Sequence, residues 1–217
     1  MHSVQDSANP IRDQRRSETT RTLIRVSRTF TAERGLAGFT IEELCAEAAV
    51  SRRTFFNYFA SKEDAVLGIP IGHSDAEAVA AFMAKPSPAA GEISPALLAD
   101  LAELTETRWR GFEVAPETVA LLIAAVDKEP RLLARMIQLG IEAEQADARL
   151  IEQREGLSEG DPRAELAAQI VGAVSRSALG AFLEPGNADP LAVVFHRRIE
   201  ATQALFASQT IPIGKPE

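Results

Sequence analysis

The sequence predicts an all-α fold, and three observations support it. Ala, Leu, Glu and Arg are abundant, apolar residues recur every three or four positions, and alternating runs of β-branched residues are missing. Apart from Pro10, every proline lies from Pro70 onward, at intervals typical of helix boundaries. The 217 residues are therefore expected to form a compact N-terminal helical domain followed by a longer helical region.

The first long helix of the N-terminal domain is expected to end at Gly35. Leu23, Val26 and Phe30 recur at helical spacing and form one apolar stripe, while arginines occupy much of the remaining surface. Gly35 follows directly and is typical of a helix C-cap, after which Leu36 returns to the core. These residues predict a helix that packs on its domain through a single face.

Two short helices are expected after this glycine. Thr40 is followed three positions later by Glu43, a capping box that predicts a helix start, and Cys45 then falls on the apolar face as a small core residue. A tight turn at residues 49–50 leads to Ser51, which is a typical N-cap for the next helix. Two short helices joined by a tight turn form a helix-turn-helix.

The second of these short helices is expected to have an inner and an outer face. Phe55 and Phe59 are four residues apart and are expected in the core. The opposite face carries Arg53, Thr54, Asn57 and Tyr58. Arg52 and Arg53 fall in the first turn, the part of a recognition helix that reaches base edges, and a guanidinium matches the two acceptors of guanine. An aromatic core stripe is the alternative, but it leaves the polar residues unexplained.

The charge distribution allows a nucleic-acid partner for the N-terminal third, although the whole chain has a net charge of −8. Residues 1–66 hold ten Lys or Arg against nine Asp or Glu, and nine of those ten basic residues are arginine. Residues 67–217 hold 13 Lys or Arg against 22 Asp or Glu, so this part of the chain carries the negative charge. Arginine suits bidentate contacts to phosphate and guanine, although a solvated basic helix is the alternative on charge alone.

Residues 40–44 and 49–63 together resemble the DNA-binding domain of TetR-family transcriptional regulators. The resemblance extends over about residues 18–66, and several positions agree at fixed spacing, so a chance match is far less expected than for one short motif. It implies a three-helix DNA-binding domain, a larger helical ligand domain and a homodimer that binds a double-stranded DNA operator. It also implies repression that a small molecule relieves.

The resemblance assigns DNA contacts to particular residues of this chain. By position it gives Thr40 a phosphate contact, Arg52 and Arg53 the base-reading positions, and Thr54, Tyr58 and Lys62 further phosphate contacts. The full set of expected DNA-binding residues is Thr40, Ser51, Arg52, Arg53, Thr54, Phe56, Asn57, Tyr58 and Lys62. Two positions depart from the family pattern, which more often has tyrosine at Phe56 and commonly histidine at Tyr58, so an apolar contact replaces a hydroxyl at Phe56.

The remaining chain is divided from the positions of its prolines. We expect a flexible arm at 1–17, the helix-turn-helix domain at 18–66, a helical ligand-binding and dimerisation domain at 67–209, and a tail at 210–217. Beyond the linking helix near residues 62–70, helices are predicted at 75–83, 95–110, 116–126, 130–155, 162–183 and 190–207.

The last two helices are the candidates for the homodimer interface. Apolar residues keep helical spacing along the last helix, and small residues allow close approach to the preceding one. The expected interface includes Gly172, Gly180, Leu191, Phe195, Ile199, Thr202 and Phe206. The alternative is that these stripes are buried inside one subunit. The resemblance favours the dimer, since two recognition helices must lie about 34–36 Å apart on successive major grooves.

A hydrophobic small-molecule effector is expected to bind the C-terminal domain. Large apolar side chains on the middle helices are candidates for its pocket, with core packing as their alternative role: Trp109, Phe112, Leu122 and Met136. Arg108, Glu113 and Asp127 are candidates for contacts to a polar end of the ligand, or else are solvated.

Composition and motifs argue against several other classes. Cys45 is the only cysteine and the three histidines lie far apart, so no metal site, disulfide or cofactor is expected. No segment approaches the roughly 20 apolar residues of a membrane helix, and a cytoplasmic protein without a membrane partner is expected. Catalytic motifs such as a nucleophile elbow or a phosphate loop are missing, so no enzyme is expected. A ligand-insensitive regulator and an architectural DNA-binding protein remain as alternatives.

Overall fold

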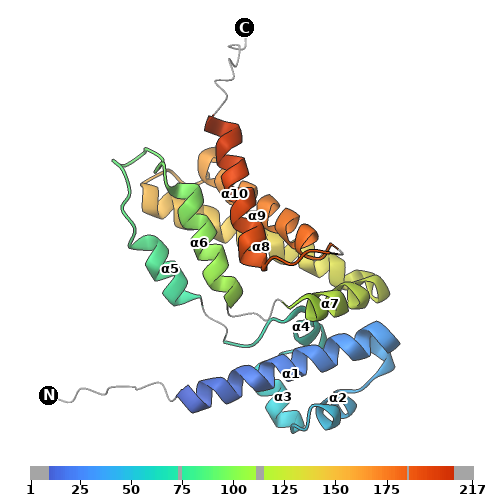
Figure 1. Cartoon of the computed structure of the whole chain (residues 1–217). Helices are drawn as coiled ribbons and strands as arrows, with labels where there is room; N and C mark the ends of the chain where they lie inside the picture. The colour runs from blue at the N-terminus through green and yellow to red at the C-terminus, as the bar shows by residue number, and fades with distance from the viewer. Residues whose placement is uncertain (1–9, 73–74, 111–114, 185, 208–217) are drawn as a thin grey trace, which may run out of the picture. The chain divides into compact units, whose positions relative to one another are not determined.

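A computed structural model describes residues 10–72, 75–110, 115–184 and 186–207, and of residues 10–13 and Arg110 the backbone only. Within these ranges the chain forms ten α-helices, one short 3-10 helix and no strand, which confirms the predicted all-α fold (Figure 1). The elements are α1 Pro10–Arg34, η1 Leu36–Gly38, α2 Ile41–Glu47, α3 Arg52–Tyr58, α4 Lys62–Leu67, α5 Ala76–Met83, α6 Leu97–Arg110, α7 Pro116–Lys128, α8 Pro130–Glu155, α9 Pro162–Phe182 and α10 Leu191–Ala207.

Helix α1 begins earlier than the sequence suggests. It starts at Pro10, so residues 10–17, which were expected in a flexible arm, are helical. Arg and Gln in this stretch favour a helix, and Gln14 Nε2 donates a hydrogen bond of 3.0 Å to Glu18 Oε1 one turn later. Residues 1–9 of the expected arm and the expected tail at 210–217 lie outside the described residues.

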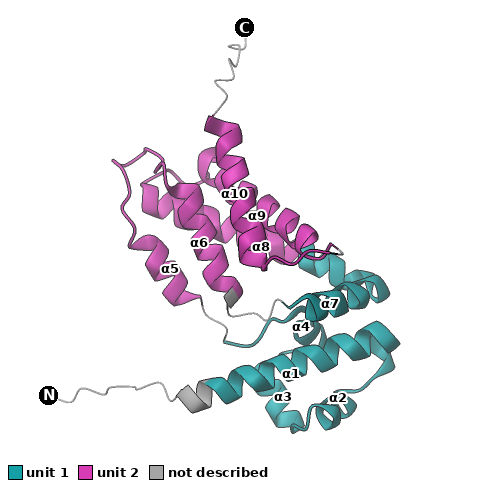
Figure 2. Ribbon diagram, in the orientation of Figure 1, with its two compact units in different colours: residues 1–74, 112–137 teal, residues 75–111, 138–217 magenta. Residues whose placement is uncertain are grey.

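The chain forms two compact units that do not follow chain order (Figure 2). Unit 1 combines residues 1–74 with 112–137, and unit 2 combines 75–111 with 138–217. The division expected from the sequence follows the chain and places everything after residue 66 in one helical domain. Helix α7 and the start of α8 therefore share the core of the helix-turn-helix, which the proline spacing does not reveal.

The core of unit 1 fixes α1 and the two helices of the helix-turn-helix, α2 and α3. Leu23 of α1, Phe55 of α3 and Phe59, which follows α3 as its C-cap, are completely buried in it. Ala125 of α7 and Leu132 of α8 are buried in the same cluster. Helix α1 thus packs on α2 and α4 and also along α7.

Two polar contacts link α7 to this core from opposite ends of the helix. Near its start, the buried Arg28 of α1 donates from Nη1 to the Thr118 carbonyl at 2.9 Å and from Nε to the Val66 carbonyl of α4 at 2.8 Å. After its end, Glu129 Oε1 accepts a 2.7 Å hydrogen bond from the backbone N–H of Leu36. A Cβ on Gly35, whose φ is +71°, would lie 2.8 Å from that oxygen, so both geometry and space require glycine there.

Unit 2 consists of α5, α6, most of α8, α9 and α10, with α9 and α10 packed on each other and on α6. Its apolar core includes Phe82, Leu101 and Phe195. A buried charged cluster lies beside this core: Arg154 of α8 donates from Nε and Nη2 to Glu155 Oε1 at 2.8 and 2.6 Å, and from Nη1 to Asp100 Oδ2 at 2.9 Å. The Arg154 guanidinium also lies 4.2 Å from the centre of the Phe82 ring.

Helix α9 begins with a charged cap whose effect depends on pH. Asp161 is the N-cap residue, and the side chain and backbone N–H groups of Arg163 bond to its carboxylate and lower its pKa from 3.8 to about 2. A lowered pKa in the folded state stabilises the fold above the unfolded pKa, and this stabilisation is lost as the pH falls toward about 2.

We expect Asp161→Asn to lower the melting temperature near neutral pH, with the difference from the native chain narrowing below about pH 4. Thermal melts followed by circular dichroism across this range test it, and a difference that does not change with pH would contradict it.

Candidate nucleic-acid interface

Helix α2 is started by the capping box that the sequence predicts. Thr40 Oγ1 accepts a 3.1 Å hydrogen bond from the Glu43 N–H, and Glu43 Oε2 accepts one of 2.7 Å from the Thr40 N–H. The Thr40 hydroxyl donates to the same Oε2 atom at 3.0 Å, and the two bonds that Thr40 donates, the backbone one foremost, lower the pKa of the Glu43 carboxyl. Cys45 lies in the core as expected, and burial raises the pKa of its thiol. The Thr40 hydroxyl is therefore held in place at the surface of unit 1.

The turn into α3 orients the recognition surface. Ala49 has a left-handed φ of +53°, and the Val50 N–H donates to the Cys45 carbonyl at 2.9 Å, which closes the end of α2. Ser51 then caps α3, its Oγ accepting from the Thr54 N–H at 3.0 Å and lying 2.8 Å from Thr54 Oγ1. Both hydroxyls are thus fixed in the first turn of the helix.

Helix α3 has the two faces that its residue spacing predicts. Phe55 and Phe59 are fully buried with ring centres 6.1 Å apart, and Phe56 packs edge-on against Phe55 while remaining 40% exposed. The outer face holds the exposed side chains of Arg52, Arg53 and Asn57 and the half-buried Thr54. The ring of Tyr58, which was expected on that face, is half-buried and packs against the core, because it follows Phe55 by only three positions. A buried aromatic pair therefore supports an exposed polar surface on a single short helix.

The two arginines of the first turn differ in their surroundings. Arg52 forms an ion pair with Glu42 of α2, and its guanidinium lies 5.5 Å from the centre of the Phe56 ring. Arg53 is exposed and forms no hydrogen bond or ion pair within the described part of the chain. Its five N–H donors are therefore available to an external acceptor, and a guanidinium fork fits the N7 and O6 atoms of guanine.

Comparison with known proteins agrees with this geometry. Residues 23–67 match the family described as "Bacterial regulatory proteins, tetR family". Over 172 residues the chain is 30% identical to the HTH-type transcriptional regulator TcmR of Streptomyces glaucescens, an alignment that covers 76% of this chain and 74% of that protein. The chain belongs to the TetR family. It is a DNA-binding transcriptional regulator with a helix-turn-helix, and its α2 and α3 lie within the matched residues.

Lys62 is engaged within this TetR-family domain itself, which the motif does not reveal. From the start of α4, its Nζ donates to the carbonyl oxygens of Leu36 at 2.5 Å and Phe39 at 2.8 Å, and it lies 4.5 Å from the centre of the Phe39 ring. Two of its three N–H donors are therefore used to hold the segment between α1 and α2. One donor remains for the phosphate contact that the family pattern assigns to this position.

We expect Lys62→Ala to lower the free energy of unfolding by about 1–2 kcal/mol, because two partly buried carbonyl groups lose a charged donor. Urea unfolding followed by circular dichroism measures the change. Lys128→Ala is the matched control, since Lys128 is an exposed lysine in the last turn of α7. Equal stabilities of the two variants would show that the hydrogen bonds of Lys62 contribute nothing to folding.

The residues expected in an effector pocket belong to both compact units. Trp109 packs against Phe195 inside unit 2 with ring centres 4.8 Å apart. Leu122 packs against the core of unit 1, and Met136 is a half-buried residue of α8 in the same unit. Phe112, like Glu113, lies outside the described residues. The position of an effector pocket in this TetR-family chain remains a prediction.

The residues expected to contact a polar end of the ligand have different surroundings. Arg108 donates from Nη1 to both carboxylate oxygens of Asp147 at 2.8 and 3.0 Å and from Nε to Asp75 Oδ2 at 2.6 Å. Its charge is thus compensated inside unit 2, where burial raises the pKa of Asp147 against the opposing effect of Arg108. Asp127 is exposed on α7.

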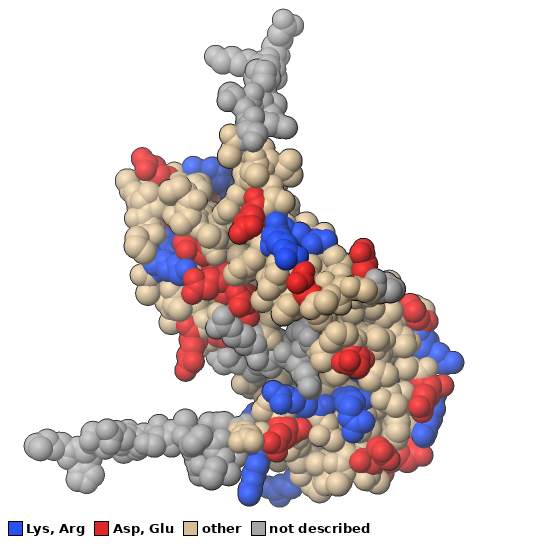
Figure 3. All heavy atoms as spheres, viewed as in Figure 1, with Lys and Arg blue, Asp and Glu red and all other residues tan. Residues whose placement is uncertain are grey.

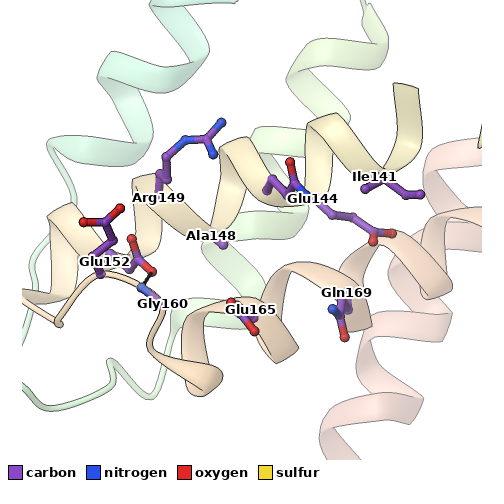
Figure 4. Close-up of a pocket in the computed structure, with 10 residues that line it drawn as sticks. Ile141, Glu144, Ala148, Arg149, Glu152, Gly160, Glu165 and Gln169 are labelled. Carbon is purple, nitrogen blue, oxygen red and sulfur yellow. Dashed lines mark hydrogen bonds between the residues drawn. The ribbon is translucent and has the colours of Figure 1, made fainter. Parts of the chain in front are cut away.

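A polar cavity lies between α8 and α9 of unit 2 (Figure 4). It has a volume of about 470 Å³, and its charged lining residues are Glu144, Arg149, Glu152, Glu159 and Glu165. Glu144 is paired with Arg176 at 2.8 Å, and Glu152 accepts a hydrogen bond from the Gly160 N–H. None of the four apolar residues expected around a hydrophobic effector lines this cavity.

The residues expected at a dimer interface divide into buried and exposed groups. Leu191, Phe195 and Ile199 are buried inside unit 2, which is the alternative that the sequence leaves open. Gly172 is covered by the Glu144 side chain, and Thr202 Oγ1 bonds to the Arg198 carbonyl at 2.8 Å. Gly180 has open space around it, and Phe206 is 61% exposed. Further exposed apolar side chains on the same two helices are Leu166, Val193 and Leu205.

Among the described residues, His, Cys, Asp and Glu nowhere form a group of three or more that is placed to hold a metal ion. The described helices include none that is long and apolar enough to span a membrane.

Proposed function

We propose that this TetR-family protein is a repressor that binds a pseudo-palindromic operator as a homodimer and is released by a small-molecule effector. The observation that carries the proposal is Arg53: an exposed guanidinium without a partner in the described chain, in the first turn of a helix that Phe55 and Phe59 fix to the core. A recognition helix reads bases through its N-terminal turns. The exposed Asn57 one turn later extends the same surface.

A dimer supplies the second recognition helix. Exposed apolar side chains on α9 and α10, among them Leu166, Leu205 and Phe206, are the surface we propose for it. A two-fold axis through such a contact pairs each surface with its own copy, and DNA then requires the two α3 helices to lie about 34–36 Å apart. This requirement explains why the operator should be a pseudo-palindrome.

Effector release requires coupling between the ligand-binding helices and the helix-turn-helix. The contacts of Arg28 and Glu129 support it, because each joins α7 to a different segment of the DNA-binding core. A shift of α7 would move the carbonyl of Thr118 and the carboxylate of Glu129 relative to α1 and η1. Coupling of this kind is reciprocal, so DNA should weaken effector binding by the same factor by which effector weakens DNA binding, typically about 5–150-fold.

Selection of genomic fragments from the host by the purified protein tests the proposal. The selection should be made near physiological salt, where sequence-independent phosphate attraction is weak. Enrichment of one palindromic site is the expected result, and the neighbouring genes would narrow the class of effector. Equal binding to scrambled duplex would instead indicate an architectural protein. The effector itself can be sought by mass spectrometry of small molecules that copurify with the protein.

A further inference from the structure

The last residue of α3 is held by two segments from elsewhere in unit 1. The guanidinium of Arg16, from α1, lies 5.4 Å from the centre of the Tyr58 ring. Arg16 Nη2 donates to the Ile71 carbonyl at 3.3 Å, and the Ile71 N–H donates to the Tyr58 carbonyl at 2.7 Å. Arg16, Tyr58 and Ile71 therefore form a closed set of contacts at the end of the recognition helix.

The early start of α1 places Arg16 there. Arg16 lies seven residues before the fully buried Leu23, so the two residues share one face of the helix. That face packs on the core at Leu23, but at Arg16 it extends beyond the apolar core and carries a charged side chain that remains exposed. Over unit 1 in Figure 3, Lys and Arg side chains are interspersed with Asp and Glu side chains.

The chemistry of this junction suits one phosphodiester group. A guanidinium has five N–H donors, and Arg16 uses one of them on the Ile71 carbonyl. The hydroxyl of Tyr58 supplies a further donor, on the ring that the Arg16 guanidinium faces, and this ring is half-buried and so restricted in position. Charged and neutral donors side by side are the usual groups that contact the DNA backbone.

From this geometry we infer that Arg16 joins Tyr58, to which the family pattern already assigns a phosphate contact, in a composite site for one backbone phosphate at the edge of the sequence that α3 reads. The inference rests on the proposed function, because it requires α3 to lie in the major groove. Arg16 is then a DNA contact contributed by α1, outside the helix-turn-helix motif. A phosphate contact holds the register of α3 on the duplex and carries no base preference of its own.

The test uses the full-length protein with the operator found by genomic selection and a scrambled duplex of equal length. We expect Arg16→Ala to weaken binding to both duplexes by about fivefold and to reduce the slope of log K against log salt by about 0.9. Arg16→Lys keeps the charge and should keep the slope. Tyr58→Phe keeps the ring and should weaken binding to both duplexes with little change in slope, since it removes only a neutral donor.

Arg25→Ala is the matched control. Arg25 is an exposed arginine on the same helix, nine residues from Arg16 and therefore on the opposite face, so its removal changes the net charge equally. Thermal melts of every variant separate a loss of folding from a loss of contact. Operator binding and salt slope that are the same for Arg16→Ala and Arg25→Ala would overturn the composite site alone. A native chain that shows no preference for any sequence would overturn the proposed function as well.

Discussion

Replacement of Arg154 by methionine should lower the free energy of unfolding by about 3–5 kcal/mol, the usual cost of removing one partner from a buried ion pair. The Arg154 side chain is 2% exposed, and its partners Glu155 and Asp100 are 0% and 9% exposed. Methionine fills much of the space beside Phe82 but leaves both carboxylates without their arginine. Lys85 and the backbone N–H of Ser94 remain as partial partners, each at 3.0 Å from one of the carboxylates.

Chemical unfolding followed by circular dichroism measures this effect. Arg176→Met is the control, because Arg176 makes an ion pair of similar length with Glu144 while its side chain is 66% exposed, and such a pair contributes at most about 1 kcal/mol. The triple variant Arg154→Met, Asp100→Asn, Glu155→Gln should recover part of the loss, since it removes the unpaired charges. A loss for Arg154→Met no larger than that for the control would show that the buried network is not what stabilises unit 2.

Replacement of Arg53 by alanine should weaken operator binding by about 1–3 kcal/mol, or roughly 5–150-fold, and relax the preference for one base pair. The reason is that its guanidinium has no competing partner in the described chain and projects from the first turn of α3. Binding to scrambled duplex should fall much less. Fluorescence anisotropy with operator variants that carry each base pair at the affected position measures both effects.

Arg52→Ala provides the comparison for Arg53→Ala within the same turn. Arg52 is already paired with Glu42 and stacked on Phe56, so it must give up those contacts before it can reach a base. We therefore expect its removal to affect operator binding less than the removal of Arg53. Equal losses on operator and scrambled DNA for Arg53→Ala would refute the base-reading role.

Local patterns in the sequence predict much of this fold because they act over a few residues. The capping box at Thr40 and the cap at Ser51 each depend on neighbours within about one turn, and the left-handed backbone of Gly35 belongs to the end of α1 itself. The same holds for the inner and outer faces of α3, where spacing alone separates Phe55 from Arg53.

Contacts between distant segments are what the sequence does not reveal. Nothing near Lys62 indicates that its ammonium bonds to carbonyls at residues 36 and 39, and nothing near Arg52 distinguishes it from Arg53. Apolar spacing likewise marks the stripe through Phe195 but cannot say whether its own chain or a second copy covers it. In α10 the structure shows that the chain itself buries this stripe, and that Leu205 and Phe206 stay outside.

The contact between Glu129 and Leu36 has a consequence for attempts to move this DNA-binding module into another protein. The end of α1 and the start of η1 rest on a carboxylate that the chain supplies 93 residues later, and the core beneath them includes Ala125 and Leu132. A graft of residues 18–66 alone would expose that core and lose the bond. A working chimera has to carry residues 112–137 as well, so the portable unit is discontinuous, and natural recombination at the end of α4 would separate parts that fold together.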